Sequence, residues 1–526
     1  MKNKLKKIPL FAALLTIVTT TFFSCTDRFD EINTNPNAPG KVTTPGLFNN
    51  AMRAVITYPR SMSGSARLAL PWIQYSAQLN YTDEDRFAFR ETTNSALFNI
   101  YYLQAQNFKS VLDLNTAPET ASEMTAYGNQ ANQIAASRIM LAYIFNKLVD
   151  VYGDIPYYSF GSDDPDFEAL NKDNPTPKFA SQEKIYTDLL KELKEAVESI
   201  DSNDKLFYDN QDNYFGSAEK LKRFGNSLRL RIANRVKHVI PGANTHIQEA
   251  IVSGVMESAD DSVGVTFEAN SVNPAPTYVA FFIDNRTDYT ASKTFIDLLK
   301  GQTGPFAVDP RLQKMIAPVG TSKFNILNKQ YTETDDLTQY QGMPYGLTSG
   351  QTTSQVNSVS LLSHAILKPD YTEYLMEYAE VEFILSEING WNQNHYEKGV
   401  RASMTKWNIP QATINSYISD LPNANEATVM TQKYIALFMQ PYEAWAEWRR
   451  TGFPNILIKP EGTGTLINPI GGSLTYTFTP LVPLTELPAR LPYPVNQYDL
   501  NPENCRAAAQ NIGGDTLETK LIWDTN

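Results

Sequence analysis

The sequence has few of the residues on which catalytic and metal centres usually depend. Only two cysteines and four histidines occur among 526 residues, and the histidines are scattered without the spacing of metal ligands. No HExxH, CxxC, Walker A, GxSxG or GxGxxG stretch is present. Two cysteines allow one disulfide at most. The motifs therefore predict no catalytic residue, no metal and no cofactor.

Positive charge is scarce as well. Lysine and arginine number 45 against 57 aspartates and glutamates, which gives a formal net charge of -12. Nucleic acid and anionic membrane surfaces are poor partners for that balance, so we expect no nucleic-acid partner. Asp260-Asp261 and Asp335-Asp336 could supply oxygen ligands to calcium, but neither pair lies in an EF-hand frame.

The first residues have the pattern of an export signal. Four lysines within residues 1–7 precede an apolar run that continues to Phe23, and Ser24-Cys25 follows. This predicts a lipoprotein signal peptide over residues 1–24, acylation of Cys25 and a polar tether over residues 25–45. An ordinary signal peptide with a coincidental cysteine is the alternative. Lipidation of Cys25 would leave Cys505 without a partner and would hold the protein at a membrane without a spanning helix.

Helical periodicity dominates the body of the chain. Apolar residues recur at spacings of three and four over 132–151, and similar stripes follow the potential N-caps Ser181 and Ser217. Basic residues on the third of these helices, Arg231 and Arg235 among them, are expected to form ion pairs with neighbouring helices. Successive helices joined by short loops predict a mostly α-helical protein of antiparallel, tetratricopeptide-like hairpins.

The segment from Gln432 to Pro454 reads as an interrupted helix. Pro441 should break it near Gln440, and Gly452 fits a left-handed C-cap. Glu443 and Glu447 share one helical face, which superficially resembles a pair of catalytic carboxylates. A solvated or ion-paired face is the interpretation that we favour.

The middle of the chain lacks this periodicity. Residues 253–369 are rich in glycine, proline, asparagine, threonine and tyrosine, which predicts a loop-rich layer with a few short strands. The helical halves would then span about 46–252 and 370–455, and an irregular C-terminal region would span 456–526.

Several segments resemble the SusD/RagB family of surface lipoproteins that bind nutrients. They occur in the family's order: DVYGDIPYYSF, FASQEKIYTDLLKELKEAV, LKRFGNSLRLRIANR, DPRL, YQGMPYGL, MEYAEVEFILSEINGW, YEAWAEWRRTGFP and LPARLPYPVNQYDLN. The resemblance implies a single domain over 46–526, with four tetratricopeptide-type hairpins decorated by loops and short strands. It also implies attachment to the outer membrane, facing the cell exterior, with a TonB-dependent, SusC-like transporter as partner.

Aromatic loops are the candidates for ligand binding. Sugars present apolar C–H faces that stack on rings, while amide, carboxylate and guanidinium groups bind their hydroxyls. The resemblance implies that the ligand face forms from two regions, one before residue 91 and one in the middle layer. Candidate contacts in these regions are Trp72, Tyr75, Gln78, Tyr81, Arg90, Phe282, Arg286, Tyr289, Tyr340 and Tyr345. Tyr75 and Tyr345 could equally be core residues.

We expect a non-enzymatic lipoprotein that binds a nutrient and serves as the lid of its transporter. An oligosaccharide is the nutrient that we favour. A surface glycoside hydrolase is one alternative. Its carboxylate pair cannot be chosen from the sequence, because such pairs are defined by their separation in space. A helical-repeat scaffold that binds only proteins is the other alternative.

Overall fold

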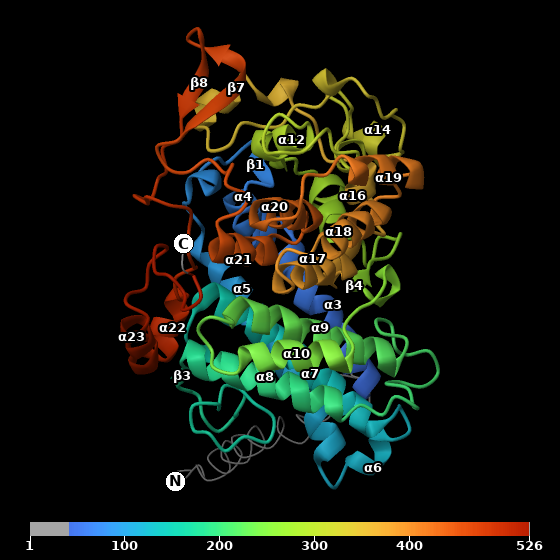
Figure 1. Ribbon diagram of the computed structural model, residues 1–526. Helices are drawn as coiled ribbons and strands as arrows, with labels where there is room; N and C mark the ends of the chain where they lie inside the picture. The colour runs from blue at the N-terminus through green and yellow to red at the C-terminus, as the bar shows by residue number, and fades with distance from the viewer. Residues whose placement is uncertain (1–41, 525–526) are drawn as a thin grey trace, which may run out of the picture. The chain divides into compact units, whose positions relative to one another are not determined.

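The computed structural model describes residues 42–524 (Figure 1). The predicted signal peptide, the predicted lipid site at Cys25 and nearly all of the predicted tether lie outside these residues, so they stay predictions. No helix within the described range is long and apolar enough to cross a membrane.

Six helices of the first half of the chain pack in sequence order, each against the next. In Figure 1, α7 to α10 run side by side in the lower half of the view. The short helices α4 (Ala69–Trp72) and α6 (Ala121–Met124) lie in the connections. The six helices are α3 (Thr44–Arg60), α5 (Glu91–Thr116), α7 (Gln130–Tyr152), α8 (Gln182–Glu198), α9 (Ala218–Val236) and α10 (Ala243–Ser253).

Side-chain caps fix where these helices begin. The hydroxyl of Ser181 accepts the backbone N–H of Lys184 at 3.3 Å, and the hydroxyl of Ser217 accepts that of Lys220 at 3.1 Å. Each bond satisfies one of the amide groups that a helix N-terminus leaves without an internal partner. Both predicted caps are confirmed.

The second helical group follows the loop-rich layer, and in it the predicted break at Pro441 is confirmed. One helix ends at Ala436, Gln440 precedes the restart, and Pro441 is the first residue of the next helix, where its missing N–H does no harm. Gly452 ends that helix with φ 73°, in the left-handed region that favours glycine. The group comprises α17 (Tyr378–Ile388), α18 (Gln393–Lys406), α19 (Gln411–Ser419), α20 (Glu426–Ala436) and α21 (Pro441–Thr451).

Short elements make up the layer that separates the two groups in the sequence, and its part around α12 and α14 lies at the top of Figure 1. Its helical pieces are η3 (Ala259–Asp261), α11 (Pro276–Tyr278), η4 (Val279–Ile283), α12 (Lys293–Leu299), α13 (Leu312–Met315), α14 (Lys323–Leu327), η5 (Leu337–Gln339), α15 (Ser349–Thr352), η6 (Val356–Ser358) and α16 (His364–Leu367).

The strands form two-stranded antiparallel pairs. The pairs are β1 (Ser76–Gln78) with β5 (Tyr289–Ala291), β2 (Ile155–Pro156) with β3 (Phe179–Ala180), β4 (Val263–Thr266) with β6 (Thr372–Met376), and β7 (Thr463–Ile470) with β8 (Ser473–Thr477). Two of them, β1–β5 and β4–β6, attach the loop-rich layer to the helical parts. A mostly helical fold with a few short strands is the fold class that the sequence predicts.

The C-terminal region returns to the first helical group. The guanidinium of Arg490, fully buried, donates to the carbonyl of Tyr152 at 2.8 and 3.2 Å and to the carboxylate of Asp515 at 2.5 Å. Two helices follow, α22 (Val495–Leu500) and α23 (Pro502–Asn511). Cys505 on α23 is buried, and burial raises the pKa of its thiol to about 12.

A buried network of ion pairs joins the two helical groups. Arg235 of α9 donates to the carboxylates of Asp150, Glu443 and Glu447. Arg231, one turn earlier, binds Glu380 through its Nε at 2.6 Å. The predicted ion pairing of the basic residues of α9 is confirmed, and Glu443 and Glu447 belong to it. We call these residues and their partners the α9–α21 ion network.

Candidate ligand-binding surface

The structure brings the two predicted ligand regions together. In the β1–β5 pair, Gln78 lies opposite Tyr289. Beyond the strand, the backbone N–H groups of Leu79 and Asn80 donate to the carbonyl of Asp288 at 2.6 and 3.2 Å. The loop after β1 and the loop before β5 therefore lie side by side, although more than 200 positions separate them in the chain.

An exposed tyrosine stands at this junction close to two arginines. Tyr81 is 54% exposed. The guanidinium carbons of Arg90 and Arg286 lie 5.9 and 5.3 Å from the centroid of its ring. Cation–π contacts of this kind hold a ring in place while part of its surface stays open. We call these three residues the Tyr81–arginine cluster.

Carboxylates orient both arginines. Arg286 donates to one oxygen of Asp288 from its Nε at 2.9 Å and from a terminal nitrogen at 2.6 Å. Arg90 pairs with Glu84 at 3.0 Å, and burial raises the pKa of that glutamate. The remaining N–H groups of two fixed guanidinium groups can donate to hydroxyl oxygens, and the ring supplies a stacking face.

The backbone presents the tyrosine at some cost. Tyr81 has φ 58°, in the left-handed region that a residue with a Cβ seldom adopts. Strain of this kind, about 1 kcal/mol or more, persists where surrounding structure imposes it, and it is frequent at functional sites.

Six of the ten candidate contacts are buried. Trp72 packs edge-on against Trp445 at 5.3 Å, Tyr75 stacks on Tyr434 at 4.4 Å, and Tyr345 lies 5.3 Å from Phe478. A ligand could reach these residues only if the covering loops moved. The six residues, each 0 to 3% exposed, are Trp72, Tyr75, Gln78, Tyr289, Tyr340 and Tyr345. Tyr75 and Tyr345 are core residues, which is the alternative that the sequence left open.

The other four candidates lie at the surface, and for them the ligand role stays a prediction. Tyr81, Arg90 and Arg286 form the cluster. Phe282 is partly buried in the π-helical turn η4, with its ring 5.2 Å from that of Tyr278.

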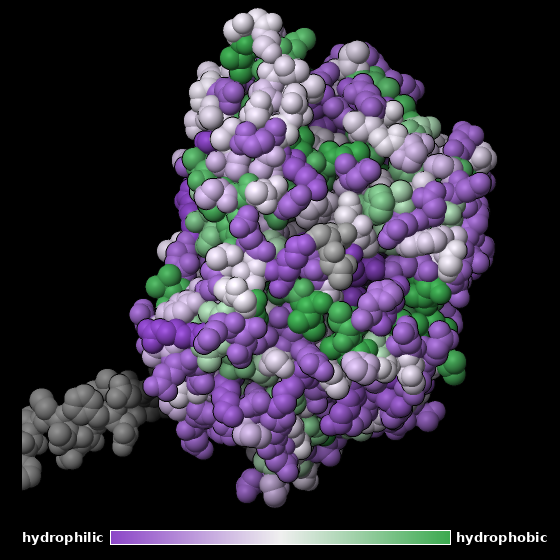
Figure 2. Space-filling model, turned by 60° about the vertical axis from the view of Figure 1, so that its left-hand side comes forward, coloured by the Kyte–Doolittle hydropathy of each residue, from purple (hydrophilic) through white to green (hydrophobic). Residues whose placement is uncertain are grey.

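Residues of α14 extend this surface and were missed in the sequence. The Nζ of Lys323 donates to the carbonyl of Phe281, within η4, at 3.1 Å, and the next residue, Phe324, is 66% exposed. Nothing in the sequence places α14 beside η4, because the two segments are about 40 residues apart and meet only in the fold. Figure 2 shows hydrophilic residues over most of the face in view, with hydrophobic residues in separate patches.

Three of the four aspartates considered for calcium accept hydrogen bonds from the protein. Asp261 accepts from Arg223 at 3.0 Å, Asp335 from Gln313 at 2.8 Å, and Asp336 from the backbone of Thr338 at 3.0 Å. Within residues 42–524, no group of three or more histidine, cysteine, aspartate or glutamate side chains is placed to hold a metal ion.

Asp85, four residues after Tyr81, is buried and makes the stability of the protein depend on pH. Burial raises its pKa from 3.8 to about 8, against the opposing effect of backbone N–H groups such as that of Gln78, 2.7 Å away. The unfolded chain releases this proton near pH 4 and the folded chain near pH 8. Stability is therefore lost as the pH rises through that window.

We expect Asp85→Asn to remove this loss. The free energy of unfolding of the variant minus that of the wild type should be larger at pH 9 than at pH 4, by on the order of 2 kcal/mol. One pKa unit corresponds to about 1.4 kcal/mol, and relaxation of the loop reduces the full effect. Thermal midpoints at both pH values measure the difference. Asp83→Asn, which changes an exposed carboxylate two residues earlier, is the control and should show no such trend. Parallel pH profiles for wild type and Asp85→Asn would contradict the assignment.

Comparison with known proteins identifies the family. A SusD-like family model described as "Starch-binding associating with outer membrane" matches residues 36–470. A second, described as "Susd and RagB outer membrane lipoprotein", matches residues 422–524. A search of curated protein sequences found no match.

Solved structures share the fold. A chitin-binding protein aligns with a TM-score of 0.71 at 22% identity, covering 92% of this chain and 100% of its own. A chitin-binding SusD homologue from Flavobacterium johnsoniae gives 0.67 and 22%, with 92% and 98% covered. A SusD homologue from Bacteroides uniformis gives 0.71 and 20%, with 92% and 100% covered. Since the first family model matches well over half of the chain, the protein belongs to the SusD-like family of starch-binding proteins associated with the outer membrane.

Proposed function

We propose that this protein binds an oligosaccharide at the Tyr81–arginine cluster and delivers it to a TonB-dependent, SusC-like transporter. It would act without making or breaking a covalent bond. The lipid on Cys25 would hold it on the outer face of the outer membrane, where it would serve as the transporter's lid.

The observation that carries the binding proposal is the exposed ring of Tyr81. A ring that is 54% exposed, flanked by two guanidinium groups that carboxylates hold in position, offers both kinds of contact that a sugar needs. The family is described as starch-binding, and two solved neighbours are named as chitin-binding. These descriptions favour a neutral glucose- or N-acetylglucosamine-based oligosaccharide.

Replacing Tyr81 by alanine should weaken oligosaccharide binding about tenfold or more, equivalent to about 1.4 kcal/mol, because the stacking face is lost. Tyr81→Phe keeps the ring and should stay within about threefold of the wild type. Isothermal titration calorimetry with maltoheptaose and chitohexaose measures both variants. Tyr127→Ala, which removes a partly exposed tyrosine beside α6, is the matched control and should bind normally.

The same samples distinguish binding from hydrolysis. Chromatography of the oligosaccharide after titration should recover it intact, whereas shortened products would favour the glycoside hydrolase alternative. No heat from any oligosaccharide, combined with capture of another protein, would favour the scaffold alternative.

Delivery to a transporter needs its own test. The full chain, extracted from its native membrane in mild detergent, should co-purify with a β-barrel protein, and Cys25→Ser should remove the protein from the membrane fraction. A membrane-bound Cys25→Ser variant would overturn the lipid anchor, and isolation of the lipoprotein without any β-barrel would overturn the lid.

A further inference from the structure

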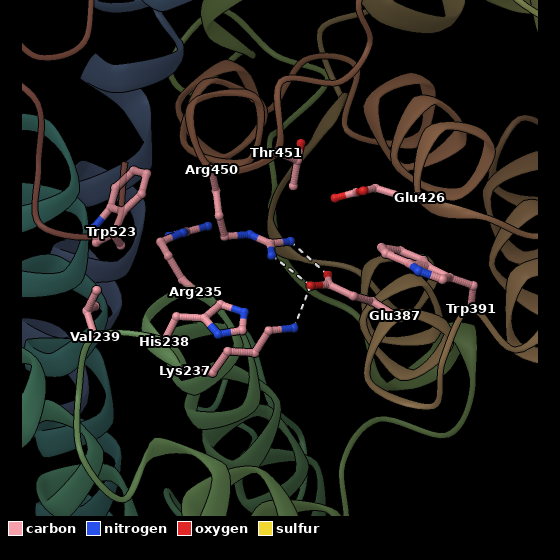
Figure 3. A pocket seen from close by; sticks show the side chains of 10 residues that line it. All are labelled: Arg235, Lys237, His238, Val239, Glu387, Trp391, Glu426, Arg450, Thr451 and Trp523. Carbon is pink, nitrogen blue, oxygen red and sulfur yellow. Dashed lines mark hydrogen bonds and ion pairs between the residues drawn. The ribbon is translucent and has the colours of Figure 1, made fainter. Parts of the chain in front are cut away.

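A cavity of about 340 Å³ lies where the C-terminal ends of α9, α17 and α21 meet the last residues of the described chain. Figure 3 shows Trp391 on one side of it and Trp523 on the other, with the polar side chains of Glu387 and Arg450 between them. None of the residues lining the cavity belongs to the Tyr81–arginine cluster or to the loops that carry it. Its size is at the lower end of the range for small-molecule pockets.

Local hydrogen bonds force Trp391 into this position. Its φ of 64° follows a φ of 70° at Gly390, so two successive residues adopt the left-handed region. Ser386 closes the turn: its carbonyl accepts the N–H of Asn392 at 2.9 Å, and its hydroxyl donates to the carbonyl of Asn392 at 2.8 Å. A glycine would adopt this conformation with less strain than a tryptophan. We take the presence of tryptophan as a sign that the indole ring itself is needed.

Glu387 presents a carboxylate of fixed orientation. Both of its oxygens accept from Arg450 at 2.7 Å, and Lys237 donates to one of them at 2.8 Å. Burial alone would raise the pKa of Glu387, but these two cations lower it to about 2, so the group stays ionised. Asn234 donates to the other oxygen at 3.0 Å, so each oxygen already accepts two hydrogen bonds and Glu387 forms a fixed wall of the cavity.

Two arginines that line the cavity each carry one donor without a partner in the described part of the chain. The Nε–H groups of Arg235 and Arg450 are buried, and among residues 42–524 neither finds a hydrogen-bond acceptor. A buried donor left unpaired costs about 1 to 3 kcal/mol, so the packing that closes off these two N–H groups is maintained at some cost.

From this geometry we propose a second carbohydrate site, which takes a neutral mono- or disaccharide. The sugar ring stacks on Trp391, its hydroxyls donate to the carboxylate of Glu426, and its oxygens accept from a terminal N–H of Arg450. Three cations and two carboxylates line the cavity and are largely paired with each other or with the α9–α21 ion network, which favours a neutral ligand over an anion. This site would bind independently of the proposed one.

The test is carried out on Tyr81→Ala protein, so that the contribution of the proposed oligosaccharide surface is reduced and the Trp391 variants report on the cavity. Maltose, N,N′-diacetylchitobiose and glucuronate are offered in saturation-transfer difference NMR titrations. We expect at least one neutral disaccharide to bind, Trp391→Ala to weaken that binding about tenfold, and Trp391→Phe to restore it to within about threefold.

A second variant guards against misfolding of Trp391→Ala. His238 is exposed and lines the cavity, so His238→Trp should fill the space and weaken binding without removing a core contact. Unchanged thermal midpoints show that each variant is folded. The proposal is overturned if Tyr81→Ala alone abolishes all binding, if neither cavity variant alters affinity, or if only glucuronate binds.

Discussion

Replacing Glu443 by alanine should destabilise the folded protein by about 3 to 5 kcal/mol, because the variant leaves buried cations without their partner. Glu443 contacts Arg235, Arg231 and Lys147, and all four side chains are no more than 7% exposed. Burial alone would raise the pKa of Glu443, but the three cations hold it well below its usual 4.5. The stabilisation is therefore present above pH 4.5 and is lost as the pH falls.

Thermal or urea unfolding at pH 7 measures this loss. Glu198→Ala, which removes an exposed carboxylate near the end of α8, is the matched control and should stay within about 0.5 kcal/mol of the wild type. Arg235→Met tests the network from the other side. The effects of Glu443→Met and Arg235→Met should not add in the double variant, since the two side chains share a contact. Additive effects, or a Glu443→Ala variant as stable as the control, would mean that the network contributes little.

The second large effect is expected at Gly342, where the backbone leaves no room for a side chain. A Cβ atom there would lie 2.4 Å from both the carbonyl oxygen of Ser292 and the Cα of Lys293. These backbone atoms belong to the segment that pairs with Met343. The N–H of Met343 donates to the carbonyl of Ala291 at 3.0 Å, and the carbonyl of Met343 accepts the N–H of Lys293 at 2.8 Å. We expect Gly342→Ala to lower the free energy of unfolding by about 3 kcal/mol or more, at the upper end of the range for overpacking. Backbone atoms, unlike a side chain, cannot rotate to relieve the clash.

Gly350→Ala provides the control, since a Cβ atom at that position meets nothing within 4 Å. It should match the wild type in thermal midpoint or slightly exceed it, as expected for glycine to alanine in a helical turn. Because Gly342 supports the start of α12 and the end of β5, its variant should also weaken oligosaccharide binding at the Tyr81–arginine cluster. A Gly342→Ala protein with normal stability would show that this pairing can open at low cost.

Local signals in the sequence were sufficient for the helices. Serine caps, a proline at the restart of α21 and a glycine at its end act within a few residues, so the chain specifies them nearly independently of the fold. The ion pairing of α9 was also predictable, because a cluster of arginines among apolar positions needs carboxylates nearby. Which carboxylates supply the charge depends on how α17 and α21 pack, and no local pattern gives that.

The ligand surface was predicted only in part. The sequence indicated the two loop regions, but composition does not distinguish a ring that stacks on ligand from one that stacks in the core. Tyr75 is buried because it packs on Tyr434, 359 positions away, and donates its hydroxyl proton to that residue's carbonyl. Trp391 shows the converse. Nothing in the sequence around it indicates a cavity, because the other walls come from α9, α21 and the end of the chain.

The burial of Cys505 makes the protein suitable for site-specific labelling. With its pKa raised to about 12, this thiol is almost entirely protonated at neutral pH, and its side chain is out of reach of reagents. The sequence contains only one other cysteine, Cys25, which the predicted lipid would block. A cysteine introduced at an exposed position, such as Phe324, would then react selectively with a maleimide fluorophore. Ligand binding and docking to a transporter could be followed with such a probe without first removing a native thiol.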